Sequence, residues 1–327
     1  MSPIARSIAA LVVGVLSAVV AHAAQPNAAS YPQRPIRLIV PSAAGGPIDT
    51  VGRAVNQGMS QFLGQQVVID NRAGAGGMIG AEIVAKSAPD GYTLLLGTPG
   101  LLMVVPHITA GASYTLNDFA PVSVLAKMPM LLLAHPALPA KSVPELIALA
   151  KSRPGKLNYA SGGVGTGIHI GFEMFNRAAG IQVTHVPYKG AAPGMTAVVG
   201  GEADLMFNAM PVALPLVKQE RLRALGIGSR KRSGFMPTVP TIAEAGLDYE
   251  YEAWYSIVVP RGTPPAIVNR LYDAVTHTLG TAELKDRLAG YGIEAVGSSP
   301  RDFAAYMREE DARMDKVITA TGLRVKK

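Results

Sequence analysis

Residues 120–135, APVSVLAKMPMLLLAH, form a nearly continuous apolar run that is long for a single strand and contains Pro129 near its middle. Proline cannot donate a hydrogen bond to a strand ladder, so it is disfavoured in the interior of a central strand. A strand that leaves one sheet at Pro129 and enters a second sheet resolves both difficulties. We therefore predict two sheets that share this segment, with a return crossing at residues 249–254.

Outside this segment, apolar runs of strand length alternate with stretches of helical pattern. Such alternation is typical of parallel sheets covered by helices on both faces, so the predicted fold class is α/β. We expect two domains, each with a mostly parallel sheet flanked by helices, and two crossover strands between them. Domain one is predicted to comprise residues 24–128 and 251–327, and domain two residues 129–250.

The N-terminus has the features of an export signal. Arg6 precedes the apolar run 8–20, and Ala21-His22-Ala23 places small residues at the positions required for a cut after Ala23. We expect residues 1–23 to be a signal peptide, with an uncleaved membrane anchor as the alternative. The chain contains no Cys, which excludes disulfides and Cys-ligated metals and suits a bacterial periplasm.

The formal net charge is +7, but the basic residues are scattered, with the densest clusters at residues 230–232 and 324–327. A nucleic-acid site would need a continuous basic stripe with interleaved aromatic residues. We therefore expect no nucleic-acid partner, although a mild positive field can attract small anions.

Two glycine-rich segments each follow a predicted strand and open a predicted helix: VPSAAGGPIDT at 40–50 and YASGGVGTGIHI at 159–170. In open α/β sheets, ligands bind beyond the carboxyl ends of strands, and the first N–H groups of a helix favour a negative charge. Neither segment contains Lys or Arg, and neither matches a P-loop or a dinucleotide motif. The pair indicates a site for a carboxylate, the alternative being two ordinary strand–helix turns.

Two side chains in these segments allow more than one interpretation. Asp49 lies in the first turn of its helix, where a carboxylate either caps the helix, or shapes a pocket or meets an amine of a ligand. His169 either holds a carbonyl of its loop or contacts a ligand. The remaining histidines form no metal-binding helix pair, and no G-x-S-x-G elbow or Cys nucleophile occurs, so we expect no metal, no cofactor and no enzyme.

Several motifs follow one another in a fixed order along nearly the whole mature chain. They are Tyr31-Pro32-x-Arg34-Pro35-Ile36, Val40-Pro41 with Gly45-Gly46-x-x-Asp49, Asn71-Arg72-x-Gly74-Ala75-Gly76-Gly77, Pro89-Asp90-Gly91-Tyr92-Thr93, Leu157-Asn158-Tyr159, His185-Val186-Pro187-Tyr188-Lys189-Gly190, Pro240-Thr241-x-Ala243-Glu244-Ala245-Gly246 and Gly262-Thr263-Pro264. This order resembles the Bug (TctC-like) extracytoplasmic solute receptors, which are the binding proteins of tripartite tricarboxylate transporters.

The resemblance implies a periplasmic, monomeric, two-domain receptor of the Venus-flytrap kind. It would hold a small organic acid between its glycine loops and deliver it to membrane permease subunits. A solute sensor that feeds a two-component kinase would have the same sequence, and a periplasmic enzyme is a third alternative. The ligand-binding residues expected from the resemblance and from the strand ends are Ser42, Ala43, Ala44, Gly45, Gly46, Asp49, Thr98, Ser161, Gly165, Thr166, His169 and Asn208.

Two of these positions depart from the pattern of the family. Ser42 stands where an aromatic residue is frequent, and Asn208 stands where Asp is common. Loss of a negative charge at residue 208 favours a dianionic ligand, whereas loss of the aromatic ring changes the size and polarity of the pocket. The identity of the acid therefore does not carry over from the family.

Overall fold

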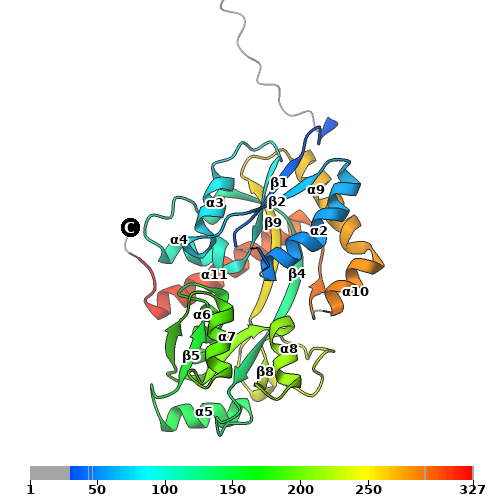
Figure 1. Cartoon of the computed structure of the whole chain (residues 1–327). Helices are drawn as coiled ribbons and strands as arrows, with labels where there is room; N and C mark the ends of the chain where they lie inside the picture. The colour runs from blue at the N-terminus through cyan, green and yellow to red at the C-terminus, as the bar shows by residue number, and fades with distance from the viewer. Residues whose placement is uncertain (1–29, 43, 46, 291, 326–327) are drawn as a thin grey trace, which may run out of the picture.

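The computed structural model describes residues 30–42, 44–45, 47–290 and 292–325. The predicted signal peptide, residues 1–23, lies outside these ranges. Figure 1 shows two lobes, one above the other, joined by the long strand β4 (Phe119–Ala134) and by β9 (Glu252–Pro260). Within the described ranges, no helix is long and apolar enough to cross a bilayer.

The first lobe, the upper one in Figure 1, contains the N-terminal strands and the C-terminal helices. Its remaining elements are β1 (Ile36–Val40), α2 (Pro47–Leu63), β2 (Val67–Asn71), α3 (Met78–Ala85), β3 (Thr93–Gly97), the π-helical segment Gly100–Val104, α4 (Val105–Ile108), α9 (Pro265–Gly280), α10 (Ala282–Gly290), β10 (Glu294–Ala295) and α11 (Pro300–Thr321). Short 3-10 segments precede α3 and β4.

The second lobe is built from the middle of the chain. Its elements are the end of β4, α5 (Val143–Ser152), β5 (Asn158–Ser161), α6 (Gly167–Ala179), β6 (Thr184–Pro187), α7 (Ala191–Val199), β7 (Leu205–Ala209), α8 (Met210–Lys218), β8 (Arg223–Ile227) and the 3-10 segment Ala243–Ala245. The strand–helix alternation that the sequence predicts is confirmed through both lobes.

β4 belongs to the sheets of both lobes. Up to Pro129, which lies opposite Glu252, it pairs with β9, and from Met130, opposite Ala209, it pairs with β7. The strand thus changes partners at the proline where the sequence indicated a crossing. The exact division of the chain into domains stays a prediction.

The hydrogen-bonded strand order is β2-β1-β3-β9-β4-β7-β5-β6, with β8 and β10 each paired to β4. Pairing is parallel between β1 and its neighbours β2 and β3, and between β5 and its neighbours β6 and β7. Around β4 and β9 it is antiparallel, because one strand leaves the first lobe and the other returns. The sheet is therefore mixed, and the carboxyl ends of the parallel strands in the two lobes face each other.

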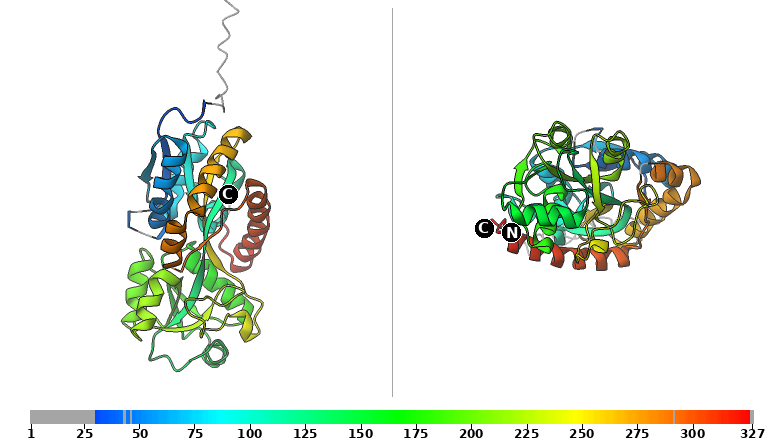
Figure 2. Two further views of the ribbon diagram at one scale, coloured as in Figure 1. Left: turned by 90° about the vertical axis from the view of Figure 1, so that its right-hand side faces the viewer. Right: turned by 90° about the horizontal axis from the view of Figure 1, so that it is seen from below.

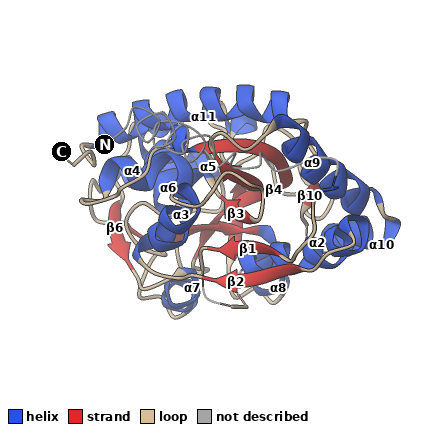
Figure 3. Cartoon of the chain, turned by 90° about the horizontal axis from the view of Figure 1, so that it is seen from above, coloured by secondary structure: helices blue, strands red, loops and turns tan. Residues whose placement is uncertain are grey.

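Helix α11 packs against both lobes on one side of the molecule. It contacts β4 and the segment Gly100–Val104 of the first lobe, and it also contacts α6 of the second. Figure 3 shows α11 along one side of the strands, and Figure 2 shows it at the edge of the molecule in two further views. Its buried side chains include Phe303, which packs edge-on against Trp254 of β9 at 5.7 Å between ring centroids.

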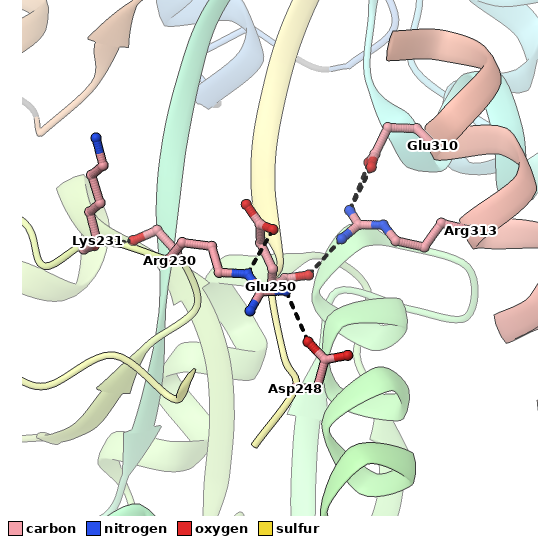
Figure 4. Close-up of polar contacts among 7 residues, drawn as sticks. Arg230, Lys231, Asp248, Glu250, Glu310 and Arg313 are labelled. Atoms are coloured by element: carbon pink, nitrogen blue, oxygen red, sulfur yellow. Dashed lines mark hydrogen bonds and ion pairs between the residues drawn. The ribbon is translucent and has the colours of Figure 1, made fainter. Parts of the chain in front are cut away.

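The return crossing just before β9 is fixed from both lobes (Figure 4). Arg313 of α11 donates to the backbone oxygen of Glu250 at 2.8 Å, and Arg230 of the second lobe donates to the carboxylates of Glu250 and Asp248. The next residue, Tyr251, donates its backbone N–H to the oxygen of Gly228 at 2.9 Å. These contacts set the position of the segment that connects the lobes.

Candidate functional site

A cavity of about 320 Å³ lies between the lobes. Its lining comes from Pro41 after β1, Thr98 after β3, Thr166 before α6, Asn208 of β7 and Tyr251 of the return crossing, among others. No Lys, Arg, Asp, Glu or His occurs among the described residues that line it. An anion bound here would therefore be held by backbone N–H groups, hydroxyls and amides.

The second glycine loop, residues 161–166, packs directly on the first lobe. Gly165 has φ of 80°, and a Cβ atom at this position would lie 2.3 Å from Cδ1 of Ile108. A Cβ atom on Gly100 would lie 3.2 Å from the backbone oxygen of Gly165. The absence of side chains at both positions lets the lobes meet beside the cavity.

Hydrogen bonds from uncharged side chains hold this loop in place. The Ser161 hydroxyl is hydrogen-bonded to Nε2 of His185 at 2.6 Å and accepts from the N–H of Gly163 at 3.0 Å. His169 accepts from the N–H of Gly165 through Nδ1 at 3.1 Å. His169 thus holds a loop N–H instead of a loop carbonyl, and neither His169 nor Ser161 lies in the cavity lining.

The two histidines stack on each other, with ring centroids 4.1 Å apart, and His185 also stacks on Tyr159. Tyr159 in turn lies flat on Phe172 at 3.9 Å, so four rings form a column under the loop. Burial lowers the pKa of His169 to about 4, with a further contribution from the charge of His185, and burial lowers the pKa of His185 to about 4. Both rings are therefore neutral at pH 7.

Thr166 lines the cavity at the start of α6, but its hydroxyl is used within the loop. Oγ1 donates to the backbone oxygen of Gly163 at 2.8 Å, and the backbone oxygen of Thr166 accepts the first helical bond, from Ile170. The N–H groups of residues 167–169 precede that bond, and such first-turn groups attract anions. The backbone of α6 is thus a better candidate for ligand contact than the threonine hydroxyl.

Thr98 and Asn208 line the cavity from opposite lobes. Thr98 Oγ1 accepts from the N–H of Leu101 at 3.3 Å. Asn208 is buried, and its Oδ1 accepts from the N–H of Ala209 at 2.8 Å, whereas its Nδ2 lies 3.8 Å from the sulfur of Met206. Sulfur is a weak acceptor, so the Asn208 amide retains donor capacity beside the cavity.

The first glycine loop lies differently. Ala44, Gly45 and Asp49 line a surface depression of about 440 Å³ together with Arg53 and other residues, instead of the interlobe cavity. Ser42 is absent from the cavity lining, although Pro41 before it and Ile48 after it contribute. Ala43 and Gly46 lie outside the described residues.

Asp49 organises the first loop. Its carboxylate accepts hydrogen bonds from the N–H of Gly45 at 2.8 Å, from Arg53 Nε at 2.8 Å and from Asn71 Nδ2 at 2.9 Å. Burial by itself raises the pKa of Asp49, but the bonds from Arg53, Gly45 and Asn71 outweigh it and lower the pKa below its usual value. The carboxylate is therefore ionised, and hydrogen bonds from Gly45, Arg53 and Asn71 occupy its oxygens. Its place among the ligand-binding residues stays a prediction.

Two tyrosines are among the cavity residues that the sequence analysis did not identify. Tyr251 and Tyr255 lie four residues apart on the return segment and β9, and both line the cavity. Both side chains are buried, and neither hydroxyl has a hydrogen-bond partner among the described residues. The available signal was the run of tyrosines at 249, 251 and 255, next to the predicted crossing at residues 249–254.

Two α/β lobes with a cavity between the carboxyl ends of their strands define a solute-binding protein of the periplasmic-binding-protein type. The family model for the tripartite tricarboxylate transporter family receptor matches residues 51–323. The chain belongs to this family, whose members are periplasmic solute-binding receptors.

Known proteins agree with this placement. BugT of Bordetella pertussis is 35% identical over 318 residues, which cover 96% of this chain and 98% of that protein. A solved R. palustris protein with adipate is 37% identical with a TM-score of 0.81, covering 89% of this chain and 98% of its own. MatC from Rhodopseudomonas palustris with bound malate is 34% identical with a TM-score of 0.79, covering 88% and 100%.

Proposed function

We propose that this chain captures a small organic acid, with a dicarboxylate as the preferred class, in the cavity between its lobes. The observation that carries the proposal is the convergence of uncharged donors on one cavity: the Asn208 amide, the tyrosine hydroxyls and the first turn of α6. The cavity volume of about 320 Å³ is at the lower end of the usual range for small-molecule sites. Relatives solved with adipate and malate support this class of ligand.

Recognition without a cationic side chain suits a protein that must release its cargo. A buried Arg–carboxylate pair forms two charge-assisted bonds, which hold an anion strongly. Neutral donors around a helix N-terminus still favour the anion, but each contributes less. The cavity would thus select carboxylates and still bind them weakly enough to release them.

The partner that we propose is the membrane permease of a tripartite tricarboxylate-type transporter. In this scheme residues 1–23 direct export to the periplasm, and the mature chain acts as a monomer. The proposed domains are residues 24–128 with 251–327, and residues 129–250; the change of partners along β4 at Pro129 supports this division. A two-component sensor would use the same cavity with a different partner.

The test is a thermal-shift screen of residues 24–327 after unfolding and refolding to remove bound cargo. Monocarboxylates, dicarboxylates, tricarboxylates, amino acids and sugars form the panel. A ligand at 100 times its Kd stabilises by about 2.7 kcal/mol, which corresponds to a rise of several degrees in Tm. A response confined to sugars, or to no compound of the panel, would contradict the proposal.

A charge substitution tests the class of ligand more directly. Asn208→Asp keeps the shape of the side chain and introduces a carboxylate into an uncharged cavity. We expect calorimetry to show a larger loss of affinity for dicarboxylates than for monocarboxylates, because repulsion scales with ligand charge. Equal losses for both classes would argue against a dianionic cargo.

A further inference from the structure

We infer that the hydroxyl of Tyr251 donates a hydrogen bond to a carboxylate of the bound acid and thereby joins the ligand to the return crossing. This inference rests on the proposed function and extends it to a residue outside both glycine loops. It assigns a specificity-determining role to a side chain that was not among the ligand-binding residues expected from the sequence.

The first argument is the state of the hydroxyl. Tyr251 is 2% exposed, yet its hydroxyl has no hydrogen-bond partner among the described residues, and the side chain lines the cavity. A phenol hydroxyl can donate one hydrogen bond, and this donor remains available to a molecule in the cavity. By contrast, the hydroxyl of Tyr249, two residues earlier, donates to the backbone oxygen of Gly171 at 2.9 Å. One tyrosine of the crossing is satisfied within the protein, and the other faces the cavity.

The second argument is the fit of Tyr251 against α6. A Cβ atom on Gly167 would lie 2.7 Å from the Tyr251 hydroxyl oxygen, and one on Gly171 would lie 2.6 Å from ring atom Cδ1. Residues four apart share one face of a helix, so these glycines leave a flat strip along which the ring lies. Gly167 is the first residue of α6, so the Tyr251 hydroxyl lies beside the N-terminus of this helix.

The two donors suit one carboxylate. A carboxylate has about four acceptor positions, so it can accept from the first-turn N–H groups of α6 and from the Tyr251 hydroxyl together. The partial positive charge of the helix end favours the anion at this point. Burial raises the pKa of the Tyr251 phenol, so the group remains a neutral donor.

The third argument is the attachment of Tyr251 to the crossing. Its backbone N–H donates to Gly228 of the second lobe, while the adjacent Glu250 is held by Arg230 of the same lobe and by Arg313 of the first lobe (Figure 4). A ligand bound to the hydroxyl therefore contacts a residue whose backbone is hydrogen-bonded to the second lobe and whose neighbour Glu250 is held by both lobes. Occupancy of the cavity is coupled in this way to the segment that connects the lobes.

The test compares Tyr251→Phe with Tyr249→Phe by calorimetry, with adipate and malate as probes. Both variants remove one hydroxyl from the same segment, but only residue 251 lines the cavity. We expect Tyr251→Phe to weaken binding of the better probe about tenfold or more, with the Tm of the unliganded protein unchanged or raised. Tyr249→Phe should lower the Tm and leave the Kd within about twofold.

The outcomes separate the inference from the proposed function. If the wild-type protein binds adipate or malate and Tyr251→Phe binds it equally well, the inference is wrong and the proposed function stands. If the wild-type protein binds no carboxylate, the proposed function fails and the inference fails with it. A lowered Tm of unliganded Tyr251→Phe, with an unchanged Kd, would reduce Tyr251 to a packing residue.

Discussion

The two glycine loops look alike in sequence and are anchored by different chemistry. Each follows a strand, opens a helix and contains a glycine with positive φ, 83° at Gly45 and 80° at Gly165. The first loop is held by the ionised carboxylate of Asp49, which is paired with Arg53. The second loop is held by Ser161 and by two neutral histidines.

The difference follows the position of the cavity. Asp49 is buried and Arg53 is half exposed; the two charges compensate each other beside a surface depression, away from the interlobe cavity. Ser161, His169 and His185 lie under the loop that lines the interlobe cavity, where a fixed charge would act on a bound anion through a low dielectric. A loop next to an uncharged binding site is thus braced by uncharged groups.

Removal of the ionic anchor is expected to have the largest effect. Asp49→Ala leaves the donors of Gly45, Arg53 and Asn71 without their shared acceptor, and we expect a loss of about 3 kcal/mol in the free energy of unfolding. Urea denaturation at pH 7 measures this loss. Arg53→Ala serves as the control: because Arg53 is largely exposed, we expect a much smaller effect. Equal effects of the two substitutions would mean that the ion pair, and not the loop contact, carries the stability.

Acidification is expected to weaken the second loop first. An unfolded histidine takes up a proton near pH 6.5, whereas His169 and His185 take theirs up near pH 4 in the folded chain. Between these values the unfolded chain binds more protons, so the free energy of unfolding falls as the pH falls. The buried His169 contributes most of this loss, because His185 is partly exposed. The pKa of Asp49 is lowered, so its contribution is lost only below about pH 4.

His169→Gln checks this assignment, because it removes one titrating ring and keeps an acceptor for the N–H of Gly165. Its urea unfolding should depend less on pH between 6.5 and 4 than that of the wild-type protein. Substitution of the exposed His277 by Gln is the matched control for loss of a histidine outside this loop. A wild-type slope retained in His169→Gln would assign the titration to other groups.

The sequence was sufficient for most of the fold, because alternating strands and helices are encoded locally. The predicted change of sheet at Pro129 is also present, because β4 pairs with β9 up to that residue and with β7 beyond it. The site was less predictable, because the residues that contact one another there are distant in the chain. Asn71, for example, is hydrogen-bonded to Asp49 across 22 residues. Tyr251 meets Gly167 only because the chain returns between the lobes, and no local pattern encodes that contact.

Alanine at the two positive-φ glycines compares the loops at matched backbone geometry. A Cβ atom on Gly45 meets no atom of the described residues within 4 Å, so Gly45→Ala incurs the backbone cost, about 1–2 kcal/mol. A Cβ atom on Gly165 also displaces the side-chain end of Ile108 in the other lobe. We expect similar losses of stability but a roughly tenfold weaker Kd for Gly165→Ala alone, a difference of about 1.4 kcal/mol. Calorimetry measures the Kd of both variants. Equal Kd values would show that the lobe contact at residue 108 does not matter for binding.

The smallest expected effect concerns Thr166, the hydroxyl residue of the second loop that lines the cavity. Its hydroxyl donates to Gly163 within the loop, so Thr166→Val should lower stability by about 1 kcal/mol and change the Kd by less than about threefold. Thr166→Ser keeps the hydroxyl and should resemble the wild-type protein in both measurements. A loss of affinity in Thr166→Val that exceeds its loss of stability would mean that the hydroxyl turns from Gly163 to the ligand on binding. The second loop would then contribute a side-chain donor as well as its backbone, and the contrast with the first loop would be sharper.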